Sequence, residues 1–236
     1  MFVATVIRSA FGFGEALVAV PLLALFLPLT VAAPLAVLLS ITIAAVVVVQ
    51  DWRHIHLGSA AGLVAATVLG IPLGLLVLTH SNEEIVKAGL GALILLFAIY
   101  SLALGDAIRL EKEHRPLLLL SGFMAGILGG AYGMNGPPLV MYGSLRGWSP
   151  QHFRATLQAY FLPASLLCMA GYWSAGLWTR ALTKDYLLSL PAMVPAVFLG
   201  RALNRRFSGA TFLKFVYSGL ILIGGLLIVE SLARYL

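Results

Sequence analysis

Apolar residues run through this chain in long segments, and charged residues are confined to the short stretches between them. From Ala16 to Val49 no charged residue occurs in 34 positions. As one helix this run would measure about 51 Å, which is too long for a single crossing of a hydrocarbon core of about 30 Å. The pattern therefore predicts a turn at "LPLTVAAP", where Pro28, Thr30 and Pro34 supply helix breakers and a cap.

The same pattern predicts eight hydrophobic segments. The first lies at the N-terminus, and the apolar runs are of helix length without the alternation that β-barrel strands show. The fold class expected is therefore an all-α polytopic membrane protein. The other seven segments are Ala32–Gln50, Leu57–Leu78, Glu84–Leu104, Pro116–Leu145, Phe153–Trp173, Tyr186–Leu203 and Ala210–Leu232.

A weak internal repeat divides the chain into two halves. "LVAVPLLALFLP" at 17–28 aligns with "LVMYGSLRGWSP" at 139–150, an offset of 122 residues. "SNEEIVKAGLGALILL" at 81–96 aligns with "SGATFLKFVYSGLILI" at 208–223, an offset of 127. Internal duplication is typical of secondary transporters. The domains predicted are an N-terminal transmembrane repeat at 1–104, a polar linker at 105–116 and a C-terminal transmembrane repeat at 117–236, each repeat with four segments.

The first segment of each half contains helix-breaking residues, "FGFGE" at 11–15 and "GGAYGMNGPP" at 129–138. Each break separates two short apolar pieces, which form either one discontinuous crossing or a re-entrant hairpin. Full crossings divide the fifteen Lys and Arg residues almost evenly between the two faces. Hairpins put ten of them on one face, and the positive-inside rule favours that arrangement. Each half then crosses three times, so the halves are inverted repeats.

Composition and charge restrict the class of protein further. The chain is 61% hydrophobic and only 10% charged, whereas soluble domains carry roughly 25% charged residues. The net charge of +6 is spread over short loops, which indicates membrane orientation and argues against nucleic acid as a partner. Cys168 is the single cysteine, so no intrachain disulfide or cysteine cluster forms, and we expect no metal or other cofactor. No HExxH or GxSxG motif occurs, so no enzyme activity is expected. The apolar outer faces are compatible with a homodimer.

The second break has the features of an anion site. Asn135 or Gly136 can cap a new helix, with Pro137 in its first turn, where a missing N–H costs little. A helix that begins inside the protein presents about half a positive charge at its N-terminus. Because Pro137 and Pro138 carry no N–H, we expect Gly136 and Leu139 to provide the free backbone donors, and the Asn135 amide to add another.

The first break places an acid at the equivalent position. The offset of 122 aligns Gly14 with Gly136 and Glu15 with Pro137. Ionised Glu15 would oppose anion binding there, whereas a carboxyl group at membrane depth can carry a proton. Arg8, seven residues earlier, is its expected ion-pair partner. Glu15 is thus the candidate coupling residue, and the candidate substrate-binding residues are Arg8, Gly12, Gly14, Tyr132, Gly133, Asn135, Gly136, Pro137 and Gln158.

Structural alternatives stay open for these residues. "YGMNGPP" could be a kink alone, and Arg8 and Glu15 could be a structural ion pair. Gly122 and Gly126 form a small-xxx-small pattern, which is more typical of close helix packing than of ligand binding.

Three stretches carry a family resemblance: "GFGEALVAVPLLAL" at 12–25, "DWRHIHL" at 51–57 with "GIPLG" at 70–74, and "GMNGPPLVMYGSLRGWSPQHFRATL" at 133–157. With them, nearly the whole chain resembles the sulfite exporter TauE/SafE family of membrane permeases. The resemblance implies a multi-pass exporter in the inner membrane, which carries small anions such as sulfite, organosulfonates or related organic anions. Glu15 departs from the pattern, because many members have a glycine or an apolar residue there.

These observations favour a secondary transporter in which the two breaks meet near the membrane midplane. The helix that begins at Gly136 would hold the anion, Arg8 and Glu15 would govern coupling or gating, and the halves would rock to alternate access. The alternative is a passive anion channel on the same fold.

Overall fold

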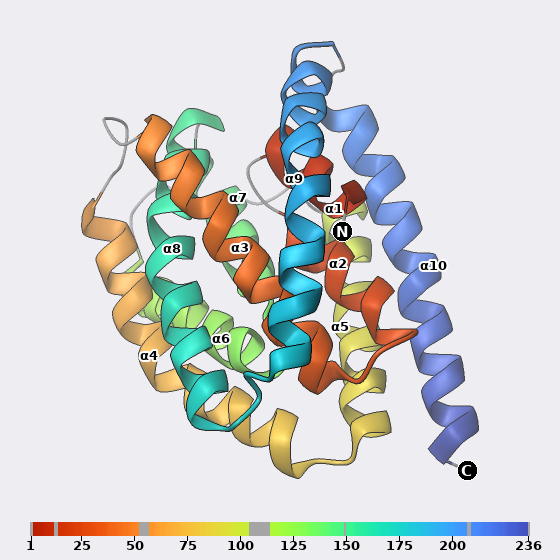
Figure 1. Ribbon diagram of the computed structural model, residues 1–236. Helices are drawn as coiled ribbons and strands as arrows, with labels where there is room; N and C mark the ends of the chain where they lie inside the picture. The colour runs from red at the N-terminus through yellow and green to blue at the C-terminus, as the bar shows by residue number, and fades with distance from the viewer. Residues whose placement is uncertain are drawn as a thin grey trace.

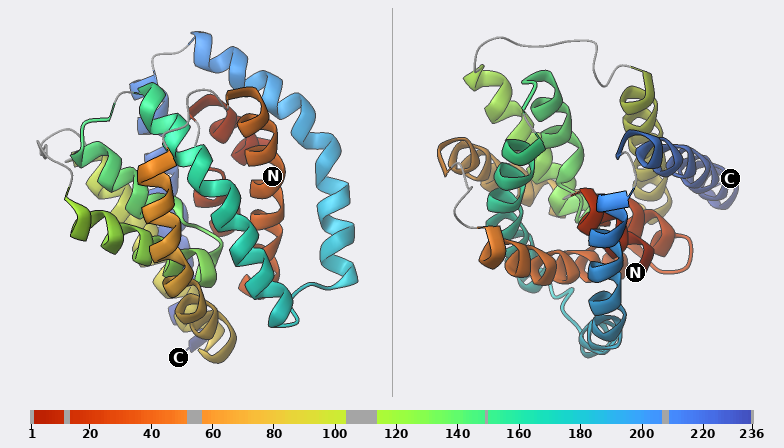
Figure 2. Two further views of the ribbon diagram at one scale, coloured as in Figure 1. Left: turned by 90° about the vertical axis from the view of Figure 1, so that its left-hand side faces the viewer. Right: turned by 90° about the horizontal axis from the view of Figure 1, so that it is seen from above.

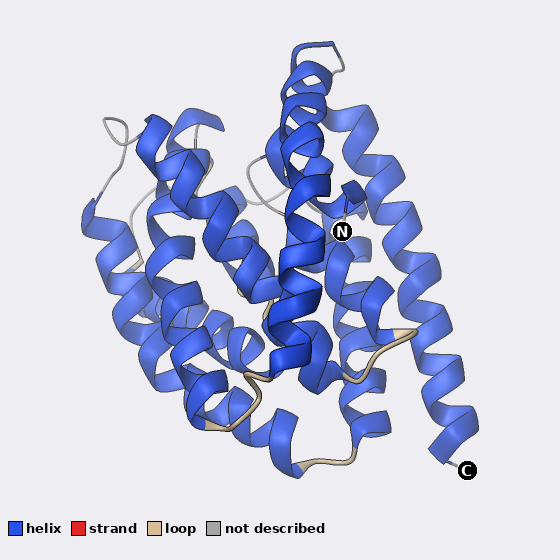
Figure 3. Cartoon of the chain, in the orientation of Figure 1, coloured by secondary structure: helices blue, strands red, loops and turns tan. Residues whose placement is uncertain are grey.

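The computed structural model describes residues 2–11, 14–51, 57–103, 114–148, 150–206 and 209–235. These residues form helices and no strand (Figures 1 and 3). The helices are α1 (Phe2–Phe11), α2 (Glu15–Ala24), α3 (Leu29–Asp51), α4 (Leu57–His80), α5 (Glu83–Ala103), α6 (Arg115–Tyr132), α7 (Gly136–Leu145), α8 (Pro150–Ser174), α9 (Arg180–Arg206) and α10 (Gly209–Tyr235).

The described residues include four helices that are long and apolar enough to cross a membrane, within α4, α5, α6 and α10. The predicted all-helical polytopic class agrees with this. Some predicted boundaries are wrong. α3 begins at Leu29 and contains Pro34, since a membrane helix tolerates proline where neighbouring groups satisfy the freed carbonyl. α9 begins six residues before the predicted Tyr186. Most of the predicted linker lies outside the described residues, and its last two residues, Arg115 and Pro116, already belong to α6.

Both predicted breaks are present, between α1 and α2 and between α6 and α7. Gly14 precedes α2 with φ of 94°, and Gly133 ends α6 with φ of 64°, a left-handed backbone that glycine adopts without steric cost. At the end of α6, the Gly133 N–H donates to the Gly129 carbonyl at 2.9 Å and the Met134 N–H to the Leu128 carbonyl at 3.2 Å. The bond from Gly133, which has a left-handed backbone, is the αL ending of a helix, so the chain leaves α6 in a fixed direction toward α7.

Apart from α7, which packs on α6, the described helices lie in three groups. α5 and α10 pack together on one side, α4, α6 and α8 lie on the other, and α1, α2, α3 and α9 lie between them (Figures 1 and 2). α3 and α8 run in opposite directions, as do α4 and α9, and α5 and α10 (Figure 1). The most extensive contacts join helices that precede the predicted linker to helices that follow it, since α4 packs on α6, α1 on α9, and α5 on α10.

Glycines bring α4 and α6 into backbone contact. A Cβ on Gly122 would lie 2.6 Å from the Leu63 carbonyl oxygen, and one on Gly126 would lie 2.4 Å from that of Thr67. Neither distance leaves room for a side chain, so the prediction that these glycines serve close packing is confirmed. The contact positions advance together along both helices, which shows that α4 and α6 run parallel.

Candidate functional site

The two breaks meet at one cavity. Its volume is about 20 Å³, enough for about one water molecule. The first turns of α2 and α7 both open onto it, and α1, α3, α5 and α8 complete its wall. The lining residues are Arg8, Gly14, Glu15, Ala16, Leu17, Ser40, Phe97, Gly133, Met134, Asn135, Gly136, Pro137 and Phe161.

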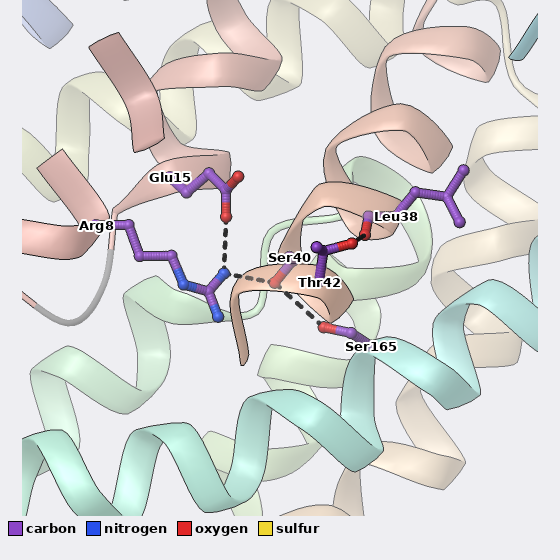
Figure 4. Close-up of polar contacts among 6 residues, drawn as sticks. All are labelled: Arg8, Glu15, Leu38, Ser40, Thr42 and Ser165. Carbon is purple, nitrogen blue, oxygen red and sulfur yellow. Dashed lines mark hydrogen bonds and ion pairs between the residues drawn. The ribbon is translucent and has the colours of Figure 1, made fainter. Parts of the chain in front are cut away.

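A buried ion pair closes one side of the cavity. Arg8 Nη1 lies 2.8 Å from Glu15 Oε2, and the two side chains are only 4% and 1% exposed (Figure 4). The same nitrogen donates to Ser40 Oγ at 2.6 Å, and the guanidinium carbon lies 5.3 Å from the centre of the Phe161 ring, within the range of a cation–π interaction. The predicted pairing of Arg8 with Glu15 is confirmed.

A second serine continues this polar chain from α3 to α8. Ser165 Oγ donates to Ser40 Oγ at 3.4 Å (Figure 4). The two residues are 125 positions apart in the sequence and meet where α3 packs against α8. Ser40 was not among the predicted site residues, because a serine within an apolar run gives no indication of its partner.

The Asn135 side chain is held between α6 and α8. Its position before α7 is as predicted, but it makes no side-chain cap bond to the helix. Instead Nδ2 points at Cys168 Sγ, 3.9 Å away, and a Cβ on Gly129 would lie 2.9 Å from the same nitrogen. Asn135 is 5% exposed, so the residues packed around it, as well as the contact with Cys168, determine the orientation of its side chain.

The predicted site residues divide into three groups. Those that line the cavity are Arg8, Gly14, Glu15, Gly133, Asn135, Gly136 and Pro137. Tyr132 is buried but is not among the lining residues, and a Cβ on Gly89 of α5 would lie 2.9 Å from its hydroxyl oxygen. Gly12 and the side chain of Gln158 lie outside the described residues. The apolar lining residues Phe97, Met134 and Phe161 gave no signal in the sequence, because large apolar residues are common throughout the chain.

The cavity has a positive electrostatic character without a net side-chain charge. The charges of Arg8 and Glu15 cancel, whereas each helix N-terminus contributes about half a positive charge. α2 begins at Glu15 and α7 begins at Gly136. The two helix starts thus pair Glu15 with Gly136, whereas the repeat offset predicted that Glu15 pairs with Pro137, one residue later. Each of the first three residues of α2 carries a backbone N–H group. Among the first three residues of α7 only Gly136 carries one, because the next two are prolines. Both breaks can therefore donate to an anion, although the sequence predicted this chiefly for the second.

These features define a class of protein: a multi-pass helical membrane protein in which two half-helices begin at a buried polar cavity, the architecture of membrane transporters. The chain belongs to the sulfite exporter TauE/SafE family, which matches residues 1–227. It is 28% identical over 186 residues to a protein of Cupriavidus necator described as a probable sulfite/organosulfonate exporter TauE, with 78% of this chain and 71% of that protein covered. No solved structure matches the chain. The family resemblance seen in the sequence is confirmed.

Proposed function

We propose that this protein is a secondary transporter of the inner membrane that exports small anions such as sulfite, organosulfonates or related organic anions. One observation supports this most: the N-termini of α2 and α7 and the buried Arg8 converge on one cavity. Neutral N–H donors suit an anion that must also be released, because their attraction is weaker than that of several fixed cations.

The opposite directions of corresponding helices support inverted repeats. The predicted rocking of one half against the other, however, conflicts with the packing, since α4 of the first half is in backbone contact with α6 of the second. We therefore propose that the moving bodies mix helices from both halves. The group α4, α6 and α8 would move relative to the pair α5 and α10, with the cavity between them.

A carrier fits the cavity better than a channel does. A channel needs a continuous aqueous path, whereas this cavity holds about one water molecule. An anion of several atoms enters only if side chains move, and alternating access requires such a rearrangement between its two open states.

Counterflow in proteoliposomes tests this function. Purified protein is loaded with unlabelled sulfite, and uptake of labelled sulfite, methanesulfonate and acetate is followed with and without an imposed pH gradient. We expect saturable movement of one anion class. Flux of every anion without accumulation would favour the channel, and no flux of any anion would contradict both.

Asn135→Leu is expected to reduce this counterflow by about tenfold or more, because an apolar side chain replaces a polar lining group at the start of α7. Thr156→Val is the matched control. Thr156 is fully buried in α8, does not line the cavity, and its hydroxyl has no hydrogen-bond partner among the described residues. Equal loss in both variants would mean that Asn135 has no specific role.

Glu15→Gln is expected to abolish the pH dependence of counterflow while the protein still inserts and folds. Glu15 is the carboxyl group of the cavity wall, and Arg8 is the charged side chain that lies against it. The measurement uses methanesulfonate, whose own charge is constant from about pH 5 to 8. A variant with the wild-type pH profile would exclude Glu15 as the coupling residue.

A further inference from the structure

We propose that the Glu15 carboxylate is a resident anion of the cavity: the transported anion displaces it from Arg8, and it returns to Arg8 when the carrier is empty. This inference rests on the proposed function and concerns the same cavity. Besides carrying a proton, Glu15 would neutralise the charge of Arg8 while the empty carrier changes back to its starting state.

The position of the carboxylate supports this assignment. Glu15 lies in the first turn of α2, where the helix N-terminus attracts negative charge, and Oε2 accepts a hydrogen bond from Arg8 at 2.8 Å. Its other oxygen, Oε1, is buried and has no hydrogen-bond partner among the described residues. A carboxylate held for structure alone normally has both oxygens satisfied when it is buried. An oxygen left open beside a cavity is instead consistent with a group that changes partners.

The size of the cavity supports displacement. With Glu15 on Arg8, the remaining volume of about 20 Å³ accepts about one water molecule. A sulfite or sulfonate ion can therefore reach Arg8 only after lining side chains have moved, and Glu15 is the lining side chain that contacts the guanidinium at 2.8 Å. The planar guanidinium suits such an exchange, because it binds carboxylate and other oxyanions with the same N–H groups.

Ser40 keeps Arg8 in place while its anionic partner changes. The serine hydroxyl accepts a hydrogen bond from Arg8 at 2.6 Å and also accepts one from Ser165 on α8 at 3.4 Å. Both serines are buried, at 5% and 1% exposure. Arg8 is thus fixed to α3 independently of Glu15, so the carboxylate can leave without taking the guanidinium with it.

The balance of charge determines what the exchange achieves. A carrier must change state both with and without its substrate if net transport is to occur. A buried guanidinium without a counter-anion is strongly unfavourable in a low-dielectric interior. In the loaded carrier the transported anion neutralises Arg8, and the displaced Glu15 carboxylate takes up a proton and becomes neutral. In the empty carrier Glu15 gives up that proton and neutralises Arg8. Without Glu15, only the loaded carrier can change state, so exchange of one anion for another continues while net efflux stops.

The test compares two modes of labelled sulfite transport in proteoliposomes: counterflow against internal sulfite, and net efflux into sulfite-free buffer. In the wild type we expect the two rates to agree within about threefold. In Glu15→Gln we expect the ratio of net efflux to counterflow to fall by about tenfold or more. Glu15→Asp, which keeps the charge, is the matched control and is expected to retain at least about half of the wild-type ratio.

Two outcomes would overturn the inference while the proposed function stands. One is a Glu15→Gln variant in which both modes fall by the same factor. The other is seen in the wild type alone. If its rate of net efflux is less than about a tenth of its rate of counterflow, Glu15 does not allow the empty carrier to return. Absence of all sulfite, sulfonate and carboxylate flux in the wild type would overturn the proposed function together with the inference.

Discussion

Arg8→Gln is expected to reduce anion counterflow by about a hundredfold and to lower the unfolding temperature of the purified protein. The substitution leaves Glu15 buried at 1% exposure without its counter-charge. Removing one partner of a buried ion pair costs about 3–5 kcal/mol. Transport is lost as well, because the guanidinium is the cationic side chain of the cavity lining. The measurements are thermal unfolding in detergent and counterflow after reconstitution.

Two controls separate the stability effect from the transport effect. The double variant Arg8→Gln/Glu15→Gln removes both charges and is expected to recover most of the stability but none of the transport. Arg234→Gln breaks the exposed pair with Glu230 on α10, and exposed pairs contribute at most about 1 kcal/mol, so it should change neither property. Wild-type transport in Arg8→Gln would exclude Arg8 from the anion site.

Gly74→Ala is expected to destabilise the protein by about 3 kcal/mol, the upper part of the range for overpacking. A Cβ at this position would lie 2.0 Å from the Ile127 carbonyl oxygen of α6. The contact is with backbone, so no rotation of a side chain can relieve it, and α4 and α6 must move apart. Because α6 leads into the second break, we also expect reduced counterflow. Thermal unfolding and yield of monodisperse protein measure the effect.

Gly225→Ala is the matched control for Gly74→Ala. Gly225 lies in α10, and no atom lies within 4 Å of a Cβ built there. Alanine is favoured over glycine in a helix interior by up to about 1 kcal/mol, so this variant should be neutral or more stable. Equal unfolding temperatures for the two variants would contradict the role given to the contact between α4 and α6.

The sequence predicted the features that depend on neighbouring residues. Both breaks follow from local glycine and proline content, and the pairing of Arg8 with Glu15 follows from a separation of seven residues and from the lack of other charges nearby. Gly122 and Gly126 were assigned to close packing, although nothing in a glycine pattern identifies the partner helix. That α4 is this partner, across the boundary between the halves, could be learned only from the structure.

Other features depend on helix rotation or on distant contacts. Tyr132 was expected at the site because it adjoins the break, but proximity in sequence does not fix the direction of a side chain, and its hydroxyl lies near Gly89. Ser40 is 32 residues from Arg8 and lies within an apolar run, where a serine commonly bonds to its own helix. The pairing of residues at the two helix starts was predicted to within one residue, which is the precision with which a weak repeat can be aligned.

The parallel packing of α4 on α6 also constrains how the protein is made. When α4 emerges during synthesis, the surface that it needs does not yet exist, because α6 follows only after α5 and the polar stretch beyond it. A fragment that ends before residue 115 lacks α6, so Gly70 and Gly74 lose the helix backbone that packs against them. The two halves expressed as separate chains should therefore be degraded when produced alone and rescued when produced together.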